Sequence, residues 1–384
     1  MAAPPEIAVH RGFSASRDPA IAAEELYRAI GKPGVSFATF YCTAEYDLPA
    51  LARELHARFG DMPLIGCTSA GEINPTGYTD GSLTGVSIVS DQLTAEIDLI
   101  DSLDSFVLSR GEQTAHNLLN RFLQRGVTPT SANTFALVLI DGLSGQEEPL
   151  VFALSRALGG MQLFGGSAGD DGRFKQTWIY YRGAFHEHSA IVALMHTTLP
   201  FMVFKTQHFE STDQRLVVTR ADPATRTVYE INGEPAAREY ARVLGLSLDR
   251  LQADVFAVHP VAVRIGGTLY VRSIMHANPD ESLTFACAIN EGIVVSVAKG
   301  LDLLADLEAL FADIRERLGP PALVLACDCL FRKMEMDQRG LRGAVGEVLA
   351  RNQVIGFATY GEQFNGMHVN QTFTGVALGY PRAA

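Results

Sequence analysis

The sequence predicts an α/β protein, with helices packed on mixed sheets and with strand-helix-loop-strand units repeated within two domains. Three observations support this prediction. Segment 65–89 recurs without a gap as segment 355–379. The chain passes three times through an apolar run, an amphipathic stretch, a glycine-rich loop and a second apolar run. Its 384 residues, 47 % of them hydrophobic, suffice for two domains with a core in each.

The repeated segment carries seven identities, which cluster at its two ends. Glycine is expected to recur where the backbone needs a positive φ or a close approach, because other residues tolerate neither cheaply. Internal duplication therefore explains the recurrence better than chance. The identities join Ile65, Gly66, Gly71, Glu72, Thr84, Gly85 and Val86 to Ile355, Gly356, Gly361, Glu362, Thr374, Gly375 and Val376.

Each passage through the repeated pattern begins with a strand of the kind that is buried on both faces, and a helix with one apolar face follows. The predicted first strands are 35–42, 135–140 and 322–327. The predicted helices are 49–59, 149–158 and 341–351. Glycine-rich loops at 65–72, 164–171 and 355–362 lead to second strands at 83–89, 190–195 and 373–378.

A stretch of different character separates the second passage from the third. Two strands are predicted within 217–232 around the turn at Asp222 and Pro223, and a helix starting near Pro235 is predicted to end at Leu244. Further strands are predicted in 261–274 and 283–297, and a helix in 301–318. We expect the main domain boundary near Arg220.

Composition and charge exclude several classes of protein. The net charge of −12 comes without a basic stripe, which argues against a nucleic-acid partner. No apolar run approaches the roughly 20 residues that span a bilayer, and the first residues lack signal-peptide character. We expect a cytoplasmic protein without membrane association. The five cysteines do not form the dense framework of a small secreted domain, so reduced thiols are expected.

Residues 165–169 match the G-x-S-x-G nucleophile elbow, with Ser167 as the candidate nucleophile. An elbow must run into a helix, whereas Asp170, Asp171 and Gly172 follow here with the chemistry of a turn. The repeated loops also carry small hydroxyl residues. We therefore expect a structural serine and a protein that is not an enzyme.

Acidic residues follow the glycine-rich loops at Glu72, Asp170, Asp171 and Glu362. Carboxylates are the ligands that hard divalent cations prefer, so a cation site is one interpretation. Carboxylates in tight turns more often accept backbone N–H bonds. Their fixed position after a glycine favours this structural role.

Cys327 and Cys329 are two residues apart, so on a strand their thiols face the same side and supply half of a tetrahedral zinc site. The other ligands would come from Cys42, which ends the equivalent first strand, or from a second subunit. Small residues at a buried strand end are the alternative interpretation, and we favour it.

Three histidines fall on or beside apolar strands, where a neutral imidazole can ligate a metal or a haem iron. They are His208, His259 and His276. A lone histidine in such a place is more often a hydrogen-bonded core residue, and that alternative stays open for each of them.

Five stretches resemble the FIST sensory family, in the expected order and from about Gly34 to Gly379. They read IGCTSAGEI, FGGSAGDDGRF, RTVYEINGEPAAREYARVLG, GGTLYVRSI and GFATYGEQFNGMHVNQTFTGVALG. The resemblance implies a FIST N-type domain over 30–220 and a FIST C-type domain over 221–382. It also implies a ligand-binding input module of bacterial signal transduction without an established catalytic role.

Within the family, FKTQHF and GGTLYVRSI make the chain resemble most the haem-binding, nitric-oxide-sensing branch called NosP. This resemblance implies haem b, nitric oxide as the ligand of its iron, and a partner that is a histidine kinase or a cyclic-di-GMP enzyme affecting biofilm behaviour. With no CxxCH present, haem would be held non-covalently.

His208 is the first candidate for the axial ligand, with Phe204 and Phe209 near the porphyrin. His259 and His276 are reserves. Arg264 or Arg272 would pair with a propionate, although each of these arginines also suits a surface ion pair. The alternative function is a sensor of another small molecule, such as an amino acid, bound between the two repeated loops. A homodimer is left open.

Overall fold

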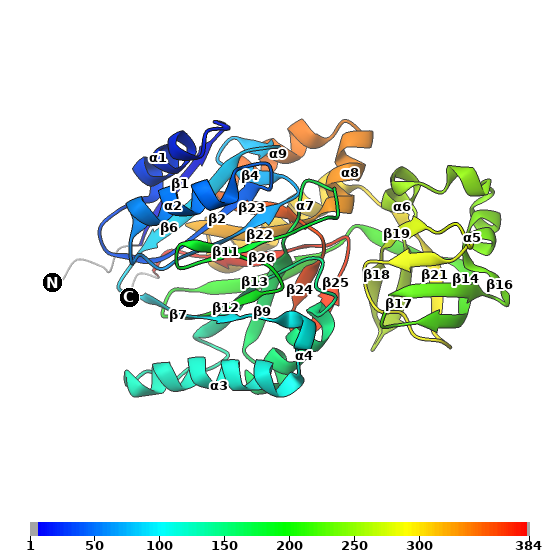
Figure 1. Cartoon of the computed structure of the whole chain (residues 1–384), viewed down its shortest axis with the longest axis horizontal. Helices are drawn as coiled ribbons and strands as arrows, with labels where there is room; N and C mark the ends of the chain where they lie inside the picture. The colour runs from blue at the N-terminus through cyan, green and yellow to red at the C-terminus, as the bar shows by residue number, and fades with distance from the viewer. Residues whose placement is uncertain (1–6, 382–384) are drawn as a thin grey trace.

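Three units of one design make up most of the protein, whose computed structural model describes residues 7–381. Each unit runs strand, helix, strand, helix, strand, two-stranded hairpin, strand. The third unit is interrupted after its first strand by a separate domain, seen on the right in Figure 1, and has one additional helix. We call this separate part, residues 207–300, the inserted domain.

The bounds of the three units follow the common pattern. Unit 1 consists of β1 (Ala8–Ser14), α1 (Pro19–Ile30), β2 (Val35–Thr43), α2 (Leu48–Phe59), β3 (Leu64–Ser69), β4 (Glu72–Asn74), β5 (Gly77–Thr79) and β6 (Leu83–Val89). Unit 2 consists of β7 (Leu93–Ile100), a 3-10 turn (Leu103–Ser105), α3 (Leu108–Gln124), β8 (Thr134–Ile140), α4 (Glu147–Ala157), β9 (Gln162–Ser167), β10 (Ile179–Tyr181), β11 (Ala184–His186) and β12 (Ala190–Thr197). Unit 3 consists of β13 (Phe201–Thr206), α7 (Leu303–Leu318), β22 (Leu323–Cys329), α8 (Leu330–Gln338), α9 (Arg342–Arg351), β23 (Val354–Thr359), β24 (Glu362–Phe364), β25 (Met367–Val369) and β26 (Phe373–Leu378).

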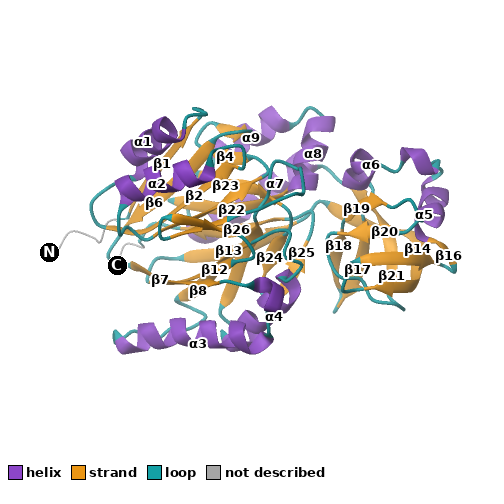
Figure 2. Cartoon of the chain, in the orientation of Figure 1, coloured by secondary structure: helices purple, strands orange, loops and turns teal. Residues whose placement is uncertain are grey.

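The four long strands of each unit form one sheet in the same order. Two middle strands pair in parallel, and the last strand lies antiparallel between one of them and the first strand. The orders are β1-β6-β2-β3, β7-β12-β8-β9 and β13-β26-β22-β23. Helices lie outside and strands inside, as Figure 2 shows.

Each unit gives its hairpin to the sheet of another unit. Hairpin β4-β5 extends the sheet of unit 3 beside β23, β24-β25 extends that of unit 2 beside β9, and β10-β11 extends that of unit 1 beside β3. The three exchanges close a ring, so no unit completes its own six-stranded sheet.

The three segments predicted as glycine-rich loops are mostly strand, because β3, β9 and β23 extend into them and leave only a short turn after each strand. Backbone hydrogen bonds close the same ring at these strand ends and turns. One N–H of the turn after each strand donates to a carbonyl at the end of another of these strands, at distances of 2.9 to 3.1 Å. The bonds run from Gly169 to Thr68, from Ala70 to Ala358 and from Tyr360 to Ser167. These hydrogen bonds therefore join the three units to one another.

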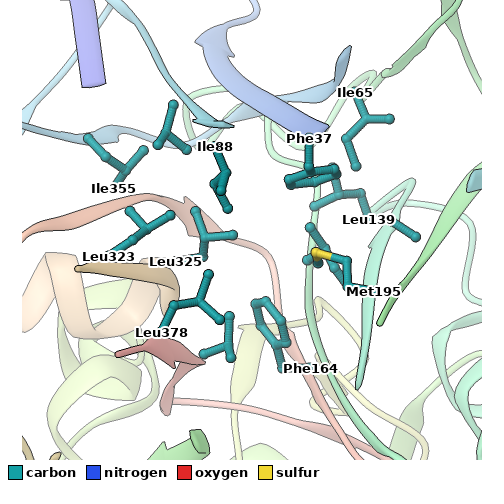
Figure 3. Close-up of a cluster of buried hydrophobic side chains, with 14 of the residues drawn as sticks. Phe37, Ile65, Ile88, Leu139, Phe164, Met195, Leu323, Leu325, Ile355 and Leu378 are labelled. Carbon is teal, nitrogen blue, oxygen red and sulfur yellow. The ribbon is translucent and has the colours of Figure 1, made fainter. Parts of the chain in front are cut away.

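The largest hydrophobic core lies where the inner faces of the three sheets meet (Figure 3). Phe37 and Ile65 come from unit 1, Phe164 from unit 2 and Leu325 from unit 3. Burial of such side chains is worth about 1.5–3 kcal/mol each, so this core joins all three units energetically.

Aspartates and glycines set the ends of several helices. Asp18, Asp47 and Asp302 accept backbone N–H bonds as N-caps of α1, α2 and α7. Helix α2 ends at Gly60, where φ is +53°. The amphipathic helices then bury one face on the outer side of a sheet.

The inserted domain has its own sheet and core. Its sheet has the order β18-β17-β21-β14-β15-β20-β19, with β16 beside β15. The connections into and out of this domain touch, since the Leu301 amide donates to the His208 carbonyl over 2.6 Å. Its elements are β14 (Phe209–Asp222), β15 (Thr227–Ile231), β16 (Glu234–Pro235), α5 (Ala236–Leu244), a 3-10 turn (Leu248–Arg250), α6 (Ala253–Val258), β17 (Val261–Ile265), β18 (Thr268–Arg272), β19 (Ile274–Ala277), β20 (Leu283–Phe285) and β21 (Val294–Gly300).

The structure confirms the α/β class and the duplication. Strands and hairpins of segment 65–89 recur at a constant offset in segment 355–379. The predicted boundary at Arg220 falls inside β14, because no glycine or proline marks the point near Thr206 where the inserted domain begins. Within residues 7–381, no helix is long and apolar enough to cross a membrane.

Candidate functional site

The glutamates after the repeated loops stabilise those loops. Glu72 accepts the hydroxyl of Ser69 on one oxygen, and the amide and hydroxyl of Ser82 on the other, at 2.9 and 2.7 Å. Burial raises the pKa of Glu72 to about 7 and that of its counterpart to about 8. The counterpart is Glu362, which binds Thr359 and Thr372 in the same way.

Asp170 organises the loop after β9. Its carboxylate accepts the amides of Phe174, Lys175 and Gln176 at 2.7 to 3.0 Å. Asp171 accepts the Thr43 hydroxyl at 2.8 Å. In the described part of the chain no three His, Cys, Asp or Glu side chains are grouped to hold a metal ion. Asp170 and Asp171 therefore make the contacts expected of carboxylates that stabilise turns.

Ser167 ends β9 and is followed by a turn, as the sequence predicts. Its hydroxyl is fully buried and accepts the Gln363 amide at 2.9 Å. The strand-to-helix geometry of a nucleophile elbow is therefore not formed at this serine.

The three cysteines considered for zinc lie in three different apolar clusters. Cys327 is in the central core, Cys329 faces the core of the inserted domain, and Cys42 lies beneath α1 and α2. All three are free and buried. Burial raises the pKa of the Cys327 and Cys329 thiols, which disfavours the thiolates that zinc requires.

His208 is buried at the entry to the inserted domain, and both of its ring nitrogens are engaged. Nε2 lies 2.7 Å from Glu335, and Nδ1 accepts from Arg332 at 2.9 Å. Phe209 packs on the imidazole with ring centroids 4.3 Å apart, and Phe204 is buried in the core of unit 3. Iron ligation needs a free ring nitrogen, so His208 does not fit haem in this arrangement.

The other residues considered for haem lie apart on the inserted domain. His259 is exposed at the end of α6, and His276 is exposed on β19. Arg264 is exposed and donates to a carbonyl of its own hairpin, while Arg272 is half-buried. The structure does not join these side chains with His208 in one pocket.

A small pocket opens at the carboxyl ends of β8, β22 and β23, and the inserted domain covers it. Its volume is about 20 Å³, which is room for one water molecule. We call it the interdomain pocket. Gly142, Phe174 and Tyr360 line it from the repeated core, and Arg226, Met275 and Ala286 line it from the inserted domain.

Arg226 joins the inserted domain to unit 2. Its Nη2 lies 2.6 Å from both Glu147 and Glu148, and its Nη1 donates to the Ala286 carbonyl at 3.2 Å. Burial lowers the pKa of Arg226, but the two carboxylates more than offset this and hold it above its ordinary value. The guanidinium is therefore a fixed cation at the pocket wall.

An aromatic pair forms the opposite wall. Phe174 stacks on Tyr360 with ring centroids 4.3 Å apart and an interplanar angle of 22°. The Tyr360 hydroxyl donates to Asp170. Phe174 has a φ of +52° and is 40 % exposed, a strained backbone state for a bulky residue. Such strain tends to cluster at ligand-binding sites.

The residues that converge on this pocket carry no signal in the sequence that marks them as a site. Arg226 and Phe174 lie inside stretches quoted for the family resemblance, but nothing in their spacing indicates that they share a pocket. Arg226 comes from a turn in the inserted domain, and Glu147 and Glu148 come from the first turn of α4. Only the folded chain brings these segments together.

This fold and pocket define a repeated α/β protein with an inserted domain closing over the core. The FIST N domain matches residues 36–234 and the FIST C domain matches residues 236–365. The chain therefore belongs to the FIST family. FIST domains are consistent with a sensor of signal transduction.

Two further proteins resemble the chain. An uncharacterized protein of Methanocaldococcus jannaschii is 25 % identical over 282 residues, which are 64 % of this chain and 54 % of that protein. The chain thus spans about half the length of this relative. A solved structure of cyanuric acid hydrolase aligns with this chain with a TM-score of 0.39 and 12 % sequence identity, over 98 % of this chain and 100 % of that chain.

Proposed function

We propose that the protein is a non-catalytic sensor whose small-molecule ligand binds in the interdomain pocket. One observation carries this proposal: the pocket lies at strand carboxyl ends, where α/β proteins bind ligands, and a second domain closes over it. A ligand there touches both domains at once. Its binding would change how the inserted domain rests on the core, and this change would be the signal.

A thermal-shift screen of metabolites tests this proposal. A true ligand should raise the unfolding temperature of the wild-type protein, and the shift should shrink in Phe174→Ala because the aromatic wall is lost. Phe152→Ala is the matched control, since Phe152 is an exposed phenylalanine on α4 that does not line the pocket. A screen without shifts, or shifts equal in Phe174→Ala and wild type, would refute the proposal.

Sensing of nitric oxide by haem b is the second candidate, supported by the resemblance to the NosP branch and by the Phe209 ring against His208. Because both ring nitrogens of His208 are engaged, this function requires the contacts with Glu335 and Arg332 to open first. In either case, we propose that the signal passes to a histidine kinase or a cyclic-di-GMP enzyme.

Haem titration distinguishes the two candidates. Haem sensing predicts a Soret band that moves when nitric oxide is added and is lost in His208→Ala but kept in His259→Ala. Circular dichroism of His208→Ala checks that the variant is folded. A protein that forms no such band with added haem is not a haem sensor.

A further inference from the structure

The interdomain pocket is surrounded by more negative than positive charge. Glu147 and Glu148 face one guanidinium, that of Arg226, and the second of these carboxylates also accepts the Ala288 amide at 2.9 Å. Asp170 lies behind Tyr360 on the opposite wall. The three carboxylates of Glu147, Glu148 and Asp170 thus outnumber the one guanidinium of Arg226. An excess of buried negative charge favours a cationic ligand.

Arg226 occupies its turn at a conformational cost. Its φ is +54°, in the left-handed region that favours glycine. It closes the turn between β14 and β15, where glycine would serve the backbone better. A strained backbone conformation persists where other contacts offset its cost. Here the contacts of the Arg226 side chain with Glu147 and Glu148 offset it.

The pocket as it stands has no space for an organic molecule. With room for about one water, it accepts a ligand only if a side chain leaves. Arg226 is the lining residue held by charge, and its guanidinium fills the position between the two carboxylates. A ligand that carries the same charge can occupy the same position.

We propose that the interdomain pocket selects a small organic cation, with a guanidinium or primary ammonium group, that replaces the Arg226 guanidinium between Glu147 and Glu148. This inference rests on the proposed sensor function and names the ligand class of that site. The aromatic wall of Phe174 and Tyr360 suits the alkyl part and the charge of such a ligand.

The replacement has a structural consequence. Arg226 forms the ion pairs between the inserted domain and α4. Other contacts between the inserted domain and the core remain, such as that of His368 Nε2 with the Ala286 carbonyl at 3.1 Å. A ligand in the place of Arg226 therefore loosens the inserted domain without detaching it. Glu147 and Glu148 bind either the ligand or Arg226, so ligand binding breaks the ion pairs that hold the domain.

Removal of Arg226 provides the test. Arg226→Gly relieves the turn and empties the position between the carboxylates. Calorimetric titration at constant ionic strength, with butylguanidinium, butylammonium and butyrate as probes, compares this variant with the wild type. Arg220→Ala is the control, because Arg220 is an ion-paired arginine of the same hairpin that does not line the pocket.

Arg226→Gly should bind butylguanidinium or butylammonium at least about tenfold more tightly than the wild type, where the tethered arginine competes. Arg220→Ala should match the wild type, and butyrate should bind to none of them. Adding Glu148→Gln to Arg226→Gly should weaken the binding of the cation. The cation that binds more tightly shows whether the site prefers a guanidinium or a primary ammonium group.

If Arg226→Gly binds neither cation, or binds them no better than Arg220→Ala does, the cation inference is overturned. A Phe174-dependent ligand that proves neutral or anionic also overturns it, yet leaves the sensor function standing. The sensor function itself fails only in the metabolite screen, so the two failures are distinguishable.

Discussion

Burial sets the acid-base behaviour of the glutamates that follow the repeated segments. Glu362 is fully buried between two hydroxyl groups, and burial raises its pKa from 4.5 to about 8. The folded state therefore binds a proton between pH 4.5 and 8 that the unfolded state has released. The free energy of unfolding should fall as the pH rises through this window, by at most about 1.4 kcal/mol per pH unit.

Glu362→Gln should remove this pH dependence, because the amide resembles the protonated acid and can still bind Thr359 and Thr372. Urea unfolding at pH 5.5 and pH 8.5 measures the effect. We expect the variant to be more stable than the wild type at the higher pH. Glu308→Gln, at an exposed ion pair, is the control and should follow the wild type. A variant that is less stable at both pH values would contradict the expectation.

The residue types in the sequence indicated which side chains make polar contacts, but not which residues they contact. The carboxylates of Glu72 and Glu362 were expected to bond to backbone amides in tight turns, and the structure shows such bonds together with hydroxyl contacts. His208 was considered for iron, but its partners come from α8, more than 120 residues later in the chain. Local sequence carries no information about such distant partners.

At the scale of the element, the repeated glycines allow parallel strands to approach closely. A Cβ atom on Gly356 of β23 would lie 2.0 Å from the Ala326 carbonyl oxygen of β22. Gly165 and Gly66 have the same relation to Val138 and Phe40, at 2.1 and 2.6 Å. The sequence left two explanations open for the repeated glycines, and both are observed. Gly66, Gly165 and Gly356 have no positive φ and serve close approach, whereas Gly71 has a φ of +135°.

Gly356→Ala should therefore destabilise the protein by about 3 kcal/mol or more, because the neighbouring carbonyl belongs to backbone and cannot move aside cheaply. Gly343→Ala is the matched control, at an open position in the first turn of α9. It should leave stability unchanged or raise it by up to about 1 kcal/mol. Urea unfolding of both variants measures the difference, and equal effects would exclude close approach as the reason for the glycine.

Elements with a strong local pattern were predictable, and those defined by pairing were not. Periodicity and caps indicated α2, α4 and α9 to within two residues. The three exchanged hairpins have strands of three residues, too short for a periodic signal. Their pairing with other units depends on long-range hydrogen bonds that no local sequence pattern encodes.

At the scale of the molecule, the hairpin exchange makes the three units interdependent while the inserted domain stands apart. Each unit lacks the outer strands of its own sheet and receives them from another unit. The inserted domain has its own sheet, and its core takes only Cys329 and Phe331 among its buried members from unit 3. Its two connections touch through His208 and Leu301. The repeated core is therefore the cooperative unit, and the inserted domain is the part that can be removed.

Replacing residues 209–300 with a short glycine-serine linker should leave a folded core. The linker has little distance to span, because the His208 carbonyl and the Leu301 amide are 2.6 Å apart. His208 is retained so that Glu335 and Arg332 keep their partner. Circular dichroism should show a folded core with one cooperative thermal transition, and gel filtration should show that it is not aggregated. The core should give no Phe174-dependent response to ligand.

Residues 7–90, which form unit 1 alone, should not fold under the same conditions. Without β10 and β11 the edge of β3 is open, and without β23 the hairpin β4-β5 has no sheet to extend. Most of its central core would also face water. A cooperative transition in this fragment would show that the exchange is dispensable, whereas an unfolded fragment beside a folded deletion variant would identify the closed ring of hairpins as the source of the core's cooperativity.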